Sequence, residues 1–317
     1  MIEILLKNKE ILRVKNPNDI SNQNLDFHVM QCIDYTDAEL NWIHEKFGID
    51  FTIMKNYEDI EISSHFLSNE NQAAFHISIP YHNENKNLVE SPIFFIISAS
   101  GLFFFSSSQV DHFFNKTYSH KFSLLHKLSE TKDIIQFQIE FISDYYADIT
   151  ENETKKVKAL ASAILLEKDF SKDIMDIITR YNFNNLLLKE SLIETTRVFN
   201  LYKKSSWGKR NDIKETIESE LNDLSVVSDY IQFNFDRLDD LKENVSNKID
   251  LEQNYIFKIL TIVTTCISLP TLIAGIYGMN FANMPELNST FGYPIILVLM
   301  VLSAVLPIIY FKRKKWF

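Results

Sequence analysis

The sequence predicts an α+β soluble domain that continues into a long helical stalk and ends in two transmembrane helices. Short β-rich runs separated by turn residues are confined to about residues 1–125. Glycine and proline are absent from 102–207 and again from 209–269, where apolar residues recur at helical spacing. Near the C-terminal end, 259–285 and 287–311 contain no charged residue. These three observations define the fold class.

The first 125 residues are expected to form a cytosolic α/β domain. The predicted strands are IEILL, FHVMQCI, AFHISIP, PIFFIISA and LFFFSS. The opening MIEILLKNKEILRV indicates two short strands around a polar turn rather than a signal peptide. Thr36 and Glu39 have the spacing of a capping box, so a helix is expected to begin there.

Residues 126–254 are predicted to form a cytosolic helical region and stalk. A continuous helix from about 211 to 276 would be roughly 100 Å long at 1.5 Å per residue. A helix of this length cannot bury its faces alone. We therefore expect it to pack against the preceding helices and against copies of itself.

Residues 255–317 are predicted to form the membrane domain, with spans at about 256–277 and 293–311. Each uncharged stretch exceeds the ~20 residues needed to cross a bilayer. Basic residues gather only after the second span, at Lys312, Arg313, Lys314 and Lys315. By the positive-inside rule both termini are then cytosolic, in a multi-pass protein of the cytoplasmic (inner) membrane.

Composition argues against several other classes of function. The net charge is −10 although residues 312–315 are all basic, so the part before the membrane is strongly acidic. That balance disfavours nucleic-acid binding and is compatible either with attracting cations or with an ordinary soluble surface. Cys32 and Cys266 fit no zinc spacing. The chain lacks HExxH, GxSxG and phosphate-binding glycine loops, so no enzyme is expected, and His65 and His76 are interpreted as structural residues on strands.

A polar stripe follows the first span in two heptad series that share one helix face. The series are Asp240, Asn247, Asn254, Thr261, Ser268 and Gly275, and Glu243, Asp250, Phe257, Thr264, Thr271 and Gly278. Other positions are mainly Ile, Leu and Val, so this face is expected to line water. The alternative for each Ser or Thr is a hydrogen bond to its own backbone or to a neighbouring helix. The aromatic ring of Phe257 either forms a hydrophobic constriction or simply packs.

The motif that closes the first span carries a family resemblance. Tyr277-Gly278-Met279-Asn280 is followed by Phe281 and then by Met284-Pro285-Glu286-Leu287. These residues resemble the CorA magnesium transporter family, whose signature is GMN, commonly followed by MPEL. DLEQNYIFKIL, FGYP and YFKRKKWF extend the likeness over about the last 70 residues, and EDIEISSHF is similar to the family's cytosolic domain.

The resemblance implies a funnel-shaped homopentamer in which the first spans surround a pore and the second spans lie outside. It implies passive Mg²⁺ influx, with Co²⁺ and Ni²⁺ as further substrates. Gly278, Met279 and Asn280 are the implied selectivity filter at the outer entrance. The predicted pore lining, partly from the stripe and partly from the resemblance, is Asn254, Phe257, Thr261, Thr264, Ser268, Thr271 and Gly275.

The chemistry of the entrance fits Mg²⁺, which gives up its water reluctantly and prefers oxygen ligands in octahedral geometry. The Asn280 side chains supply neutral carbonyl oxygens that could hold the hydrated ion. Glu286 in the outer loop either raises the local cation concentration or is an ordinary solvated charge.

Regulation by intracellular Mg²⁺ is expected from the acidic stalk, because carboxylates of adjacent subunits repel when bare and are bridged by the ion. The candidate metal-binding residues are Glu218, Glu220, Asp223, Asp236, Asp239, Asp240 and Glu243. A second possible location is the surface around Glu58, Asp59 and Glu61.

Two other functions remain open. One is a zinc transporter of the same superfamily, which the intact GMN and MPEL motifs disfavour. The other belongs to a different class: a membrane-anchored sensor or enzyme whose active part is residues 1–250.

Overall fold

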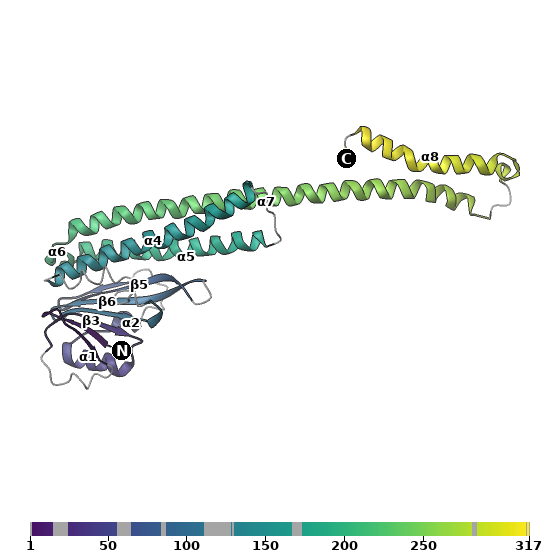
Figure 1. Cartoon of the computed structure of the whole chain (residues 1–317). Coiled ribbons are helices and arrows are strands. Elements are labelled where there is room, and N and C mark those ends of the chain that lie inside the picture. Colours follow the sequence, from purple (N-terminus) through teal and green to yellow (C-terminus); the bar gives the residue numbers. More distant parts are fainter. Residues whose placement is uncertain are drawn as a thin grey trace. The chain divides into compact units, whose positions relative to one another are not determined.

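The computed structural model describes residues 2–14, 25–55, 65–83, 87–110, 128, 130–166, 173–280, 284–314 and 316. The chain divides into two compact units, Met1–Leu241 and Lys242–Phe317. Helix α7 (Lys214–Tyr277) contributes to both units (Figure 1). The three-part division at residues 125 and 254 stays a prediction.

The first unit is built on a mixed sheet, which in the described residues has seven strands in the order β2-β1-β3-β7-β6-β5-β4. Neighbouring strands are antiparallel except β3 and β7, which are parallel. The strands are β1 (Ile2–Leu6), β2 (Ile11–Val14), β3 (Phe27–Ile33), β4 (Phe66–Ser68), β5 (Gln72–His82), β6 (Leu88–Ser98) and β7 (Gly101–Ser106).

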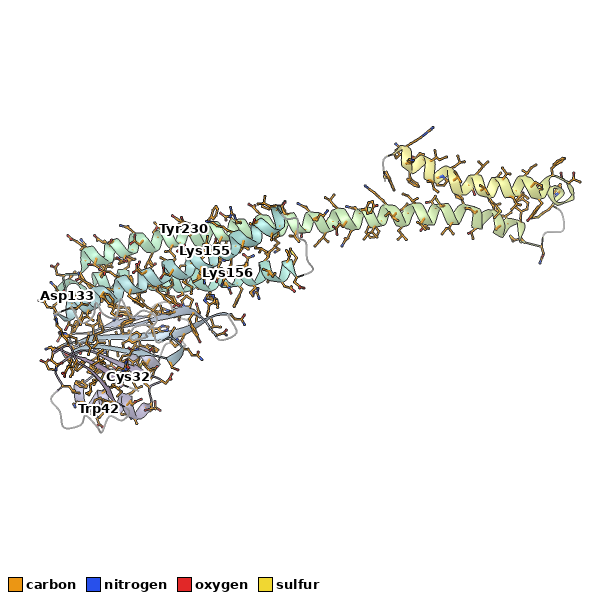
Figure 2. All side chains as sticks on the ribbon, viewed as in Figure 1. Cys32, Trp42, Asp133, Lys155, Lys156 and Tyr230 are labelled. Carbon is orange, nitrogen blue, oxygen red and sulfur yellow. The ribbon has the colours of Figure 1, made fainter. Side chains whose placement is uncertain are left out.

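Both faces of this sheet are buried, which explains why its strands are apolar runs rather than alternating sequences. Along β6, Phe95 belongs to one core and the adjacent Phe94 to the other. Helices α1 (Asp37–Phe47) and α2 (Thr52–Lys55) contribute to the core that contains Phe94. Cys32 is buried in the same core, and burial raises the pKa of its thiol (Figure 2). The predicted capping box of Thr36 and Glu39 is present at the start of α1.

Long helices cover the other face of the sheet: α4 (Thr131–Leu165), α5 (Ile174–Lys204), the short α6 (Ser206–Arg210) and the first half of α7. Within α7, Leu224, Ile231 and Leu238 recur every seven residues and are buried. Asn234 lies on the same seam, where its side-chain amide donates hydrogen bonds to Thr154 on α4 and Asn185 on α5. This polar contact fixes the register of the three helices.

A buried carboxylate also connects the helices to the sheet. Glu153 on α4 is fully buried and lies 2.5 Å from the Lys156 ammonium and 3.2 Å from Nε2 of His82 on β5. Its second oxygen accepts a hydrogen bond of 3.0 Å from Asn184 on α5. Figure 2 labels Lys156 on α4. Three partners thus compensate the charge that Glu153 brings into the interior.

The second unit contains the remainder of α7, the 3₁₀ helix η4 (Pro285–Asn288) and α8 (Gly292–Arg313). Helix α7 runs without a break from Lys214 to Tyr277, which confirms the uninterrupted helix expected from about 211 to 276. His65 lies in the turn before β4 rather than on a strand, and its Nδ1 is 2.9 Å from Nδ1 of His76 on β5. Residues 56–64, which include Glu58, Asp59 and Glu61, lie outside the described residues.

Candidate functional site

The second half of α7 and all of α8 are apolar helices whose side chains are mostly exposed. Each contains a stretch of 18 strongly apolar residues, almost none of which are buried. Exposed apolar surface of this extent is unfavourable in water. Both helices are long and apolar enough to cross a membrane.

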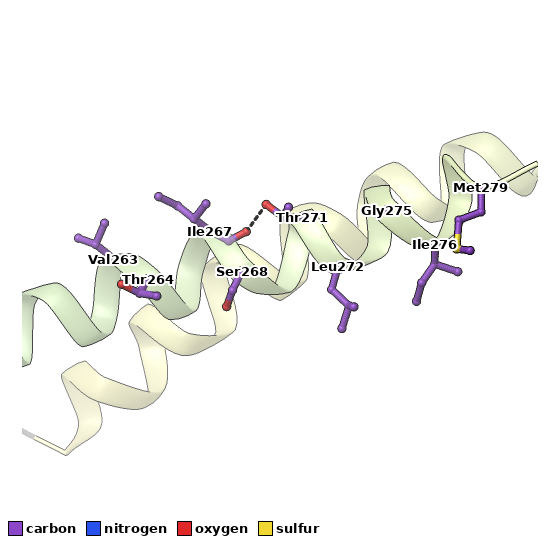
Figure 3. A pocket seen from close by; sticks show the side chains of 9 residues that line it. All are labelled: Val263, Thr264, Ile267, Ser268, Thr271, Leu272, Gly275, Ile276 and Met279. Atoms are coloured by element: carbon purple, nitrogen blue, oxygen red, sulfur yellow. Dashed lines mark hydrogen bonds between the residues drawn. The ribbon is translucent and has the colours of Figure 1, made fainter.

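One face of α7 in this unit is partly covered. Ile262 is buried, and Cys266, Pro270 and Ile273 are half-buried at helical spacing. Figures 1 and 3 both show α8 alongside this part of α7. We conclude that the covered face packs against α8.

The polar stripe lies on the opposite face of α7. Thr264, Ser268, Thr271 and Gly275 are each two positions from a covered residue, a rotation of about 200° around the helix. All of the predicted pore-lining residues are exposed, including Asn254 and Phe257 about two to three turns before Thr264, and Phe257 is 62% exposed. Within the second unit, the predicted residues therefore lie together on one face that α8 does not cover.

A groove of about 810 Å³ follows this face (Figure 3). Among the described residues, its lining comes from α7 and from Met279 just beyond the helix end: Val263, Thr264, Ile267, Ser268, Thr271, Leu272, Gly275, Ile276 and Met279. Five of these nine residues were predicted from the sequence as pore or filter residues. A Cβ atom at Gly275 would meet nothing within 4 Å, so the glycine leaves the groove wide at this point.

The hydroxyl groups of the stripe donate to the backbone of their own helix. Thr261 donates to the Phe257 carbonyl at 2.7 Å, Thr271 to the Ile267 carbonyl at 2.8 Å, and Ser268 to the Thr265 carbonyl at 3.3 Å. The local hydrogen bonds considered as an alternative are thus present. They do not remove the polar face, because each exposed oxygen keeps lone pairs that can accept.

The GMN motif ends α7. The Gly278 amide donates to the Ala274 carbonyl at 2.8 Å, and the Met279 amide donates to the Ile276 carbonyl at 3.3 Å. A Cβ atom on Gly278 would lie 3.0 Å from the same Ala274 oxygen, so the helix end is tight there. Asn280 follows as an exposed residue, beyond which 281–283 are not described.

Gly292, the first residue of α8, is a position that the sequence analysis did not single out. A Cβ atom at this position would lie 2.1 Å from the Glu286 carbonyl oxygen, because η4 packs against the start of α8. The Glu286 side chain itself is exposed. The FGYP sequence contained the signal, a glycine between aromatic residues at a helix start, but only the structure shows the close approach.

The acidic stalk residues fall into two environments. Glu218 is paired with Lys203 and Lys214, at 3.6 and 3.8 Å, and Asp236 accepts a hydrogen bond from Gln232. Asp239, Asp240 and Glu243 are exposed.

Glu220 and Asp223 lie beside Glu140 and Asp144 of α4, which the sequence analysis missed although the pair has i, i+4 spacing. Burial raises the pKa of Glu220; repulsion from Asp223, Glu140 and Asp144 adds to the shift, and a hydrogen bond with Ser143 opposes it. Burial and Asp144 likewise raise the pKa of Glu140. Among the described residues, no group of three or more His, Cys, Asp or Glu side chains is arranged to hold a metal ion.

The two apolar helices, with a polar stripe ending at the Gly278-Met279-Asn280 motif, are the features of a membrane ion transporter. The family described as "CorA-like Mg2+ transporter protein" matches residues 29–313, and the chain belongs to this family. Its members are ion transporters, so the prediction that the chain is not an enzyme is confirmed.

Individual relatives match along most of their length. The "Magnesium transport protein CorA" of Wolinella succinogenes is 28% identical over 283 residues, which cover 88% of each protein. The protein of the same name from Campylobacter jejuni strain RM1221 is 27% identical over 329 residues and 100% of both. The complete structure of the CorA magnesium transporter from Methanocaldococcus jannaschii has a TM-score of 0.75 and 20% identity, covering 100% of this chain and 99% of that one. The last comparison shows a shared fold.

Proposed function

We propose that this chain is the subunit of a homopentameric channel that carries Mg²⁺ passively into the cell, with Co²⁺ and Ni²⁺ as further substrates. The observation that carries the proposal is the uncovered polar stripe of α7. If copies of α7 surround an axis with this face inward, the stripe lines a water-filled path and α8 lies outside, toward lipid. The site is built from several copies of one face, which is why a single chain shows an open groove.

The lining suits a cation that keeps its water. Mg²⁺ dehydrates reluctantly, and the water molecules around it point their hydrogens outward. Thr261, Ser268 and Thr271 present oxygen lone pairs, because their own hydrogens are engaged with the backbone. Asn280 adds amide oxygens at the entrance. These groups accept from the hydration shell without replacing it.

The direction of transport follows from electrostatics. A divalent ion gains about 4.6 kcal/mol per 100 mV on entering a negative interior, twice the value for one charge. Inward flow therefore needs no other energy source. In the proposed topology the chain lies in the inner membrane. Both termini and the stalk are in the cytosol, and the loop that contains Glu286 is outside.

Intracellular Mg²⁺ is proposed to close the channel by binding the acidic stalk. Glu220 and Asp223, with Glu140 and Asp144, repel one another when no ion is present. Because the described residues of one chain hold no complete metal site, the proposed site includes carboxylates of a neighbouring subunit or the water shell of the ion. Bridging would hold the subunits together and narrow the pore near Phe257. Single neutralising substitutions to Asn or Gln, followed by measurement of inhibition by internal Mg²⁺, test the remaining candidates, which are Glu218, Asp236, Asp239, Asp240 and Glu243.

Ion flux into proteoliposomes tests the proposal against its alternatives. Purified protein would be reconstituted with an internal dye and a potassium-diffusion potential, and Mg²⁺, Co²⁺, Ni²⁺ and Zn²⁺ would be compared with and without a proton gradient. We expect Mg²⁺ influx that follows the potential and does not require protons. Proton-dependent Zn²⁺ influx without Mg²⁺ influx would instead identify a zinc transporter, and no flux of any ion would favour a membrane-anchored sensor.

A further inference from the structure

The end of α8 carries a cluster that ion transport does not explain. The Trp316 amide donates to the Phe311 carbonyl at 3.2 Å, and the Trp316 ring lies 4.8 Å from the Phe311 ring. The Tyr310 ring is 5.5 Å from Phe311 on its other side. The Lys314 amide donates to the Tyr310 carbonyl, which caps the helix. The chain after α8 is therefore held against the helix end instead of extending away from it.

Basic residues stand between these aromatic residues in the sequence. Lys312, Arg313 and Lys314 are exposed, and within the described part of the chain none of them forms an ion pair. Lys258 on α7 is also exposed and, like Lys312, lies about 20 residues along its helix from the loop that joins α7 and α8. Because the two helices run side by side in opposite directions, both charges fall at the same end of the unit.

Within the second unit, few acidic residues could balance this charge. From Gln253 to the end of the sequence, Glu286 is the single acidic residue, and it lies in the loop at the opposite end of both helices. The closest acidic residue before that segment, Glu252, is 3.6 Å from Lys248 and so already has a basic partner. Among the described residues of this unit the cluster has no ion-pair partner, so its charge is available to attract an anionic molecule.

We propose that Lys312, Arg313 and Lys314, together with Trp316, bind the headgroups of anionic phospholipids. The cluster directly follows the apolar window of α8, where the boundary between acyl chains and headgroups would lie. Trp and Tyr favour that boundary, and long basic side chains reach from it to phosphates. Arg313 can contact a phosphate through two N–H groups, whereas an uncharged headgroup surface offers no net attraction. The inference rests on the proposed membrane insertion but not on ion transport.

Quenching of Trp316 fluorescence by brominated lipids tests this site. Full-length protein would be placed in nanodiscs of phosphatidylcholine that contain a fixed fraction of either brominated phosphatidylglycerol or brominated phosphatidylcholine. Because both leaflets contain the same lipids, the quenching does not depend on which side of the membrane Trp316 occupies. Trp42 and Trp207 lie in the first unit, and W316F gives their background signal. Each basic residue near an anionic surface changes the association constant about fivefold.

In the wild type, brominated phosphatidylglycerol is expected to quench Trp316 fluorescence several-fold more strongly than brominated phosphatidylcholine does. Added salt should weaken this preference. K312Q/R313Q/K314Q should remove most of it, whereas the charge-conserving K312R/R313K/K314R should keep it. The matched control, K204Q/K209Q/K242Q, removes three exposed basic residues elsewhere and should also keep it.

Three results would overturn the inference. Equal quenching by both lipids would reject a headgroup site while leaving the membrane position intact, and so would an undiminished preference in K312Q/R313Q/K314Q. Absence of quenching by either lipid would reject the membrane position of α8 as well, which separates a failure of the proposed insertion from a failure of the headgroup site.

Discussion

Replacing Gly292 by alanine should damage the loop that holds the proposed channel entrance. The added Cβ would lie 2.1 Å from the Glu286 carbonyl oxygen, whereas ordinary contacts begin at 3.4 Å. The backbone of η4 and the start of α8 must therefore separate by more than 1 Å. Overpacking of this kind typically costs about 1–3 kcal/mol. Because the obstacle is a backbone atom, side-chain rotation cannot relieve it.

The effect can be measured by thermal unfolding in detergent and by Mg²⁺ flux in proteoliposomes. Gly275→Ala is the matched control for stability, since a Cβ at that helix position meets nothing within 4 Å. We expect Gly292→Ala to lower the unfolding temperature of the membrane unit and to reduce flux, while Gly275→Ala unfolds as the wild type does. A Gly292→Ala protein with unchanged stability and unchanged flux would refute the proposed packing of η4 on α8.

Three further predictions concern the stripe, the stalk and the interior of the first unit. After replacement of Cys266, cysteines at Thr261, Ser268 and Thr271 should react with small water-soluble thiol reagents and those at Ile262 and Ile273 should not; uniform protection or equal labelling of both faces would contradict a pore lining. Because the pKa of Glu220 is raised above its ordinary 4.5, its charge lowers stability as the pH rises through the folded-state pKa. Glu220→Gln should therefore raise the unfolding temperature of the stalk at pH 7.5 but not at pH 4, and should lessen stabilisation by Mg²⁺; an equal effect at both pH values would exclude the electrostatic explanation. Glu153→Ala leaves Lys156, His82 and Asn184 without their shared acceptor and should cost about 3–5 kcal/mol in chemical denaturation; a loss below 1 kcal/mol would show that the carboxylate is dispensable.

Local sequence signals predicted much of the fold. The strands and the α1 cap follow from apolar runs, turn residues and the Thr36/Glu39 spacing, all of which act between neighbours in the chain. The long α7 follows from the absence of glycine and proline over 209–269 and from its heptad periodicity, which outweigh the interruption by Pro270. The polar stripe was predictable for the same reason, because a helix converts spacing directly into a face.

Contacts between distant segments were not predictable in this way. The pairing of β3 with β7 joins residues that lie more than 70 positions apart, and no local pattern encodes it. Glu140 and Asp144 could be recognised as neighbours of Glu220 only once α4 and α7 were packed together. Likewise, the close approach of Gly292 to Glu286 depends on the path of the loop and not on the propensity of either residue.

The most direct test of the proposed pore is Mg²⁺ flux through Asn280→Ala in proteoliposomes under a negative internal potential. The substitution removes an exposed amide without opening a cavity, so the oligomer should stay assembled by size-exclusion chromatography. We predict potential-driven influx for the wild type and none above protein-free vesicles for Asn280→Ala, with Asn280→Asp binding the ion more tightly and passing it more slowly. Influx through assembled Asn280→Ala at the wild-type rate would contradict the entrance and the ion path along α7.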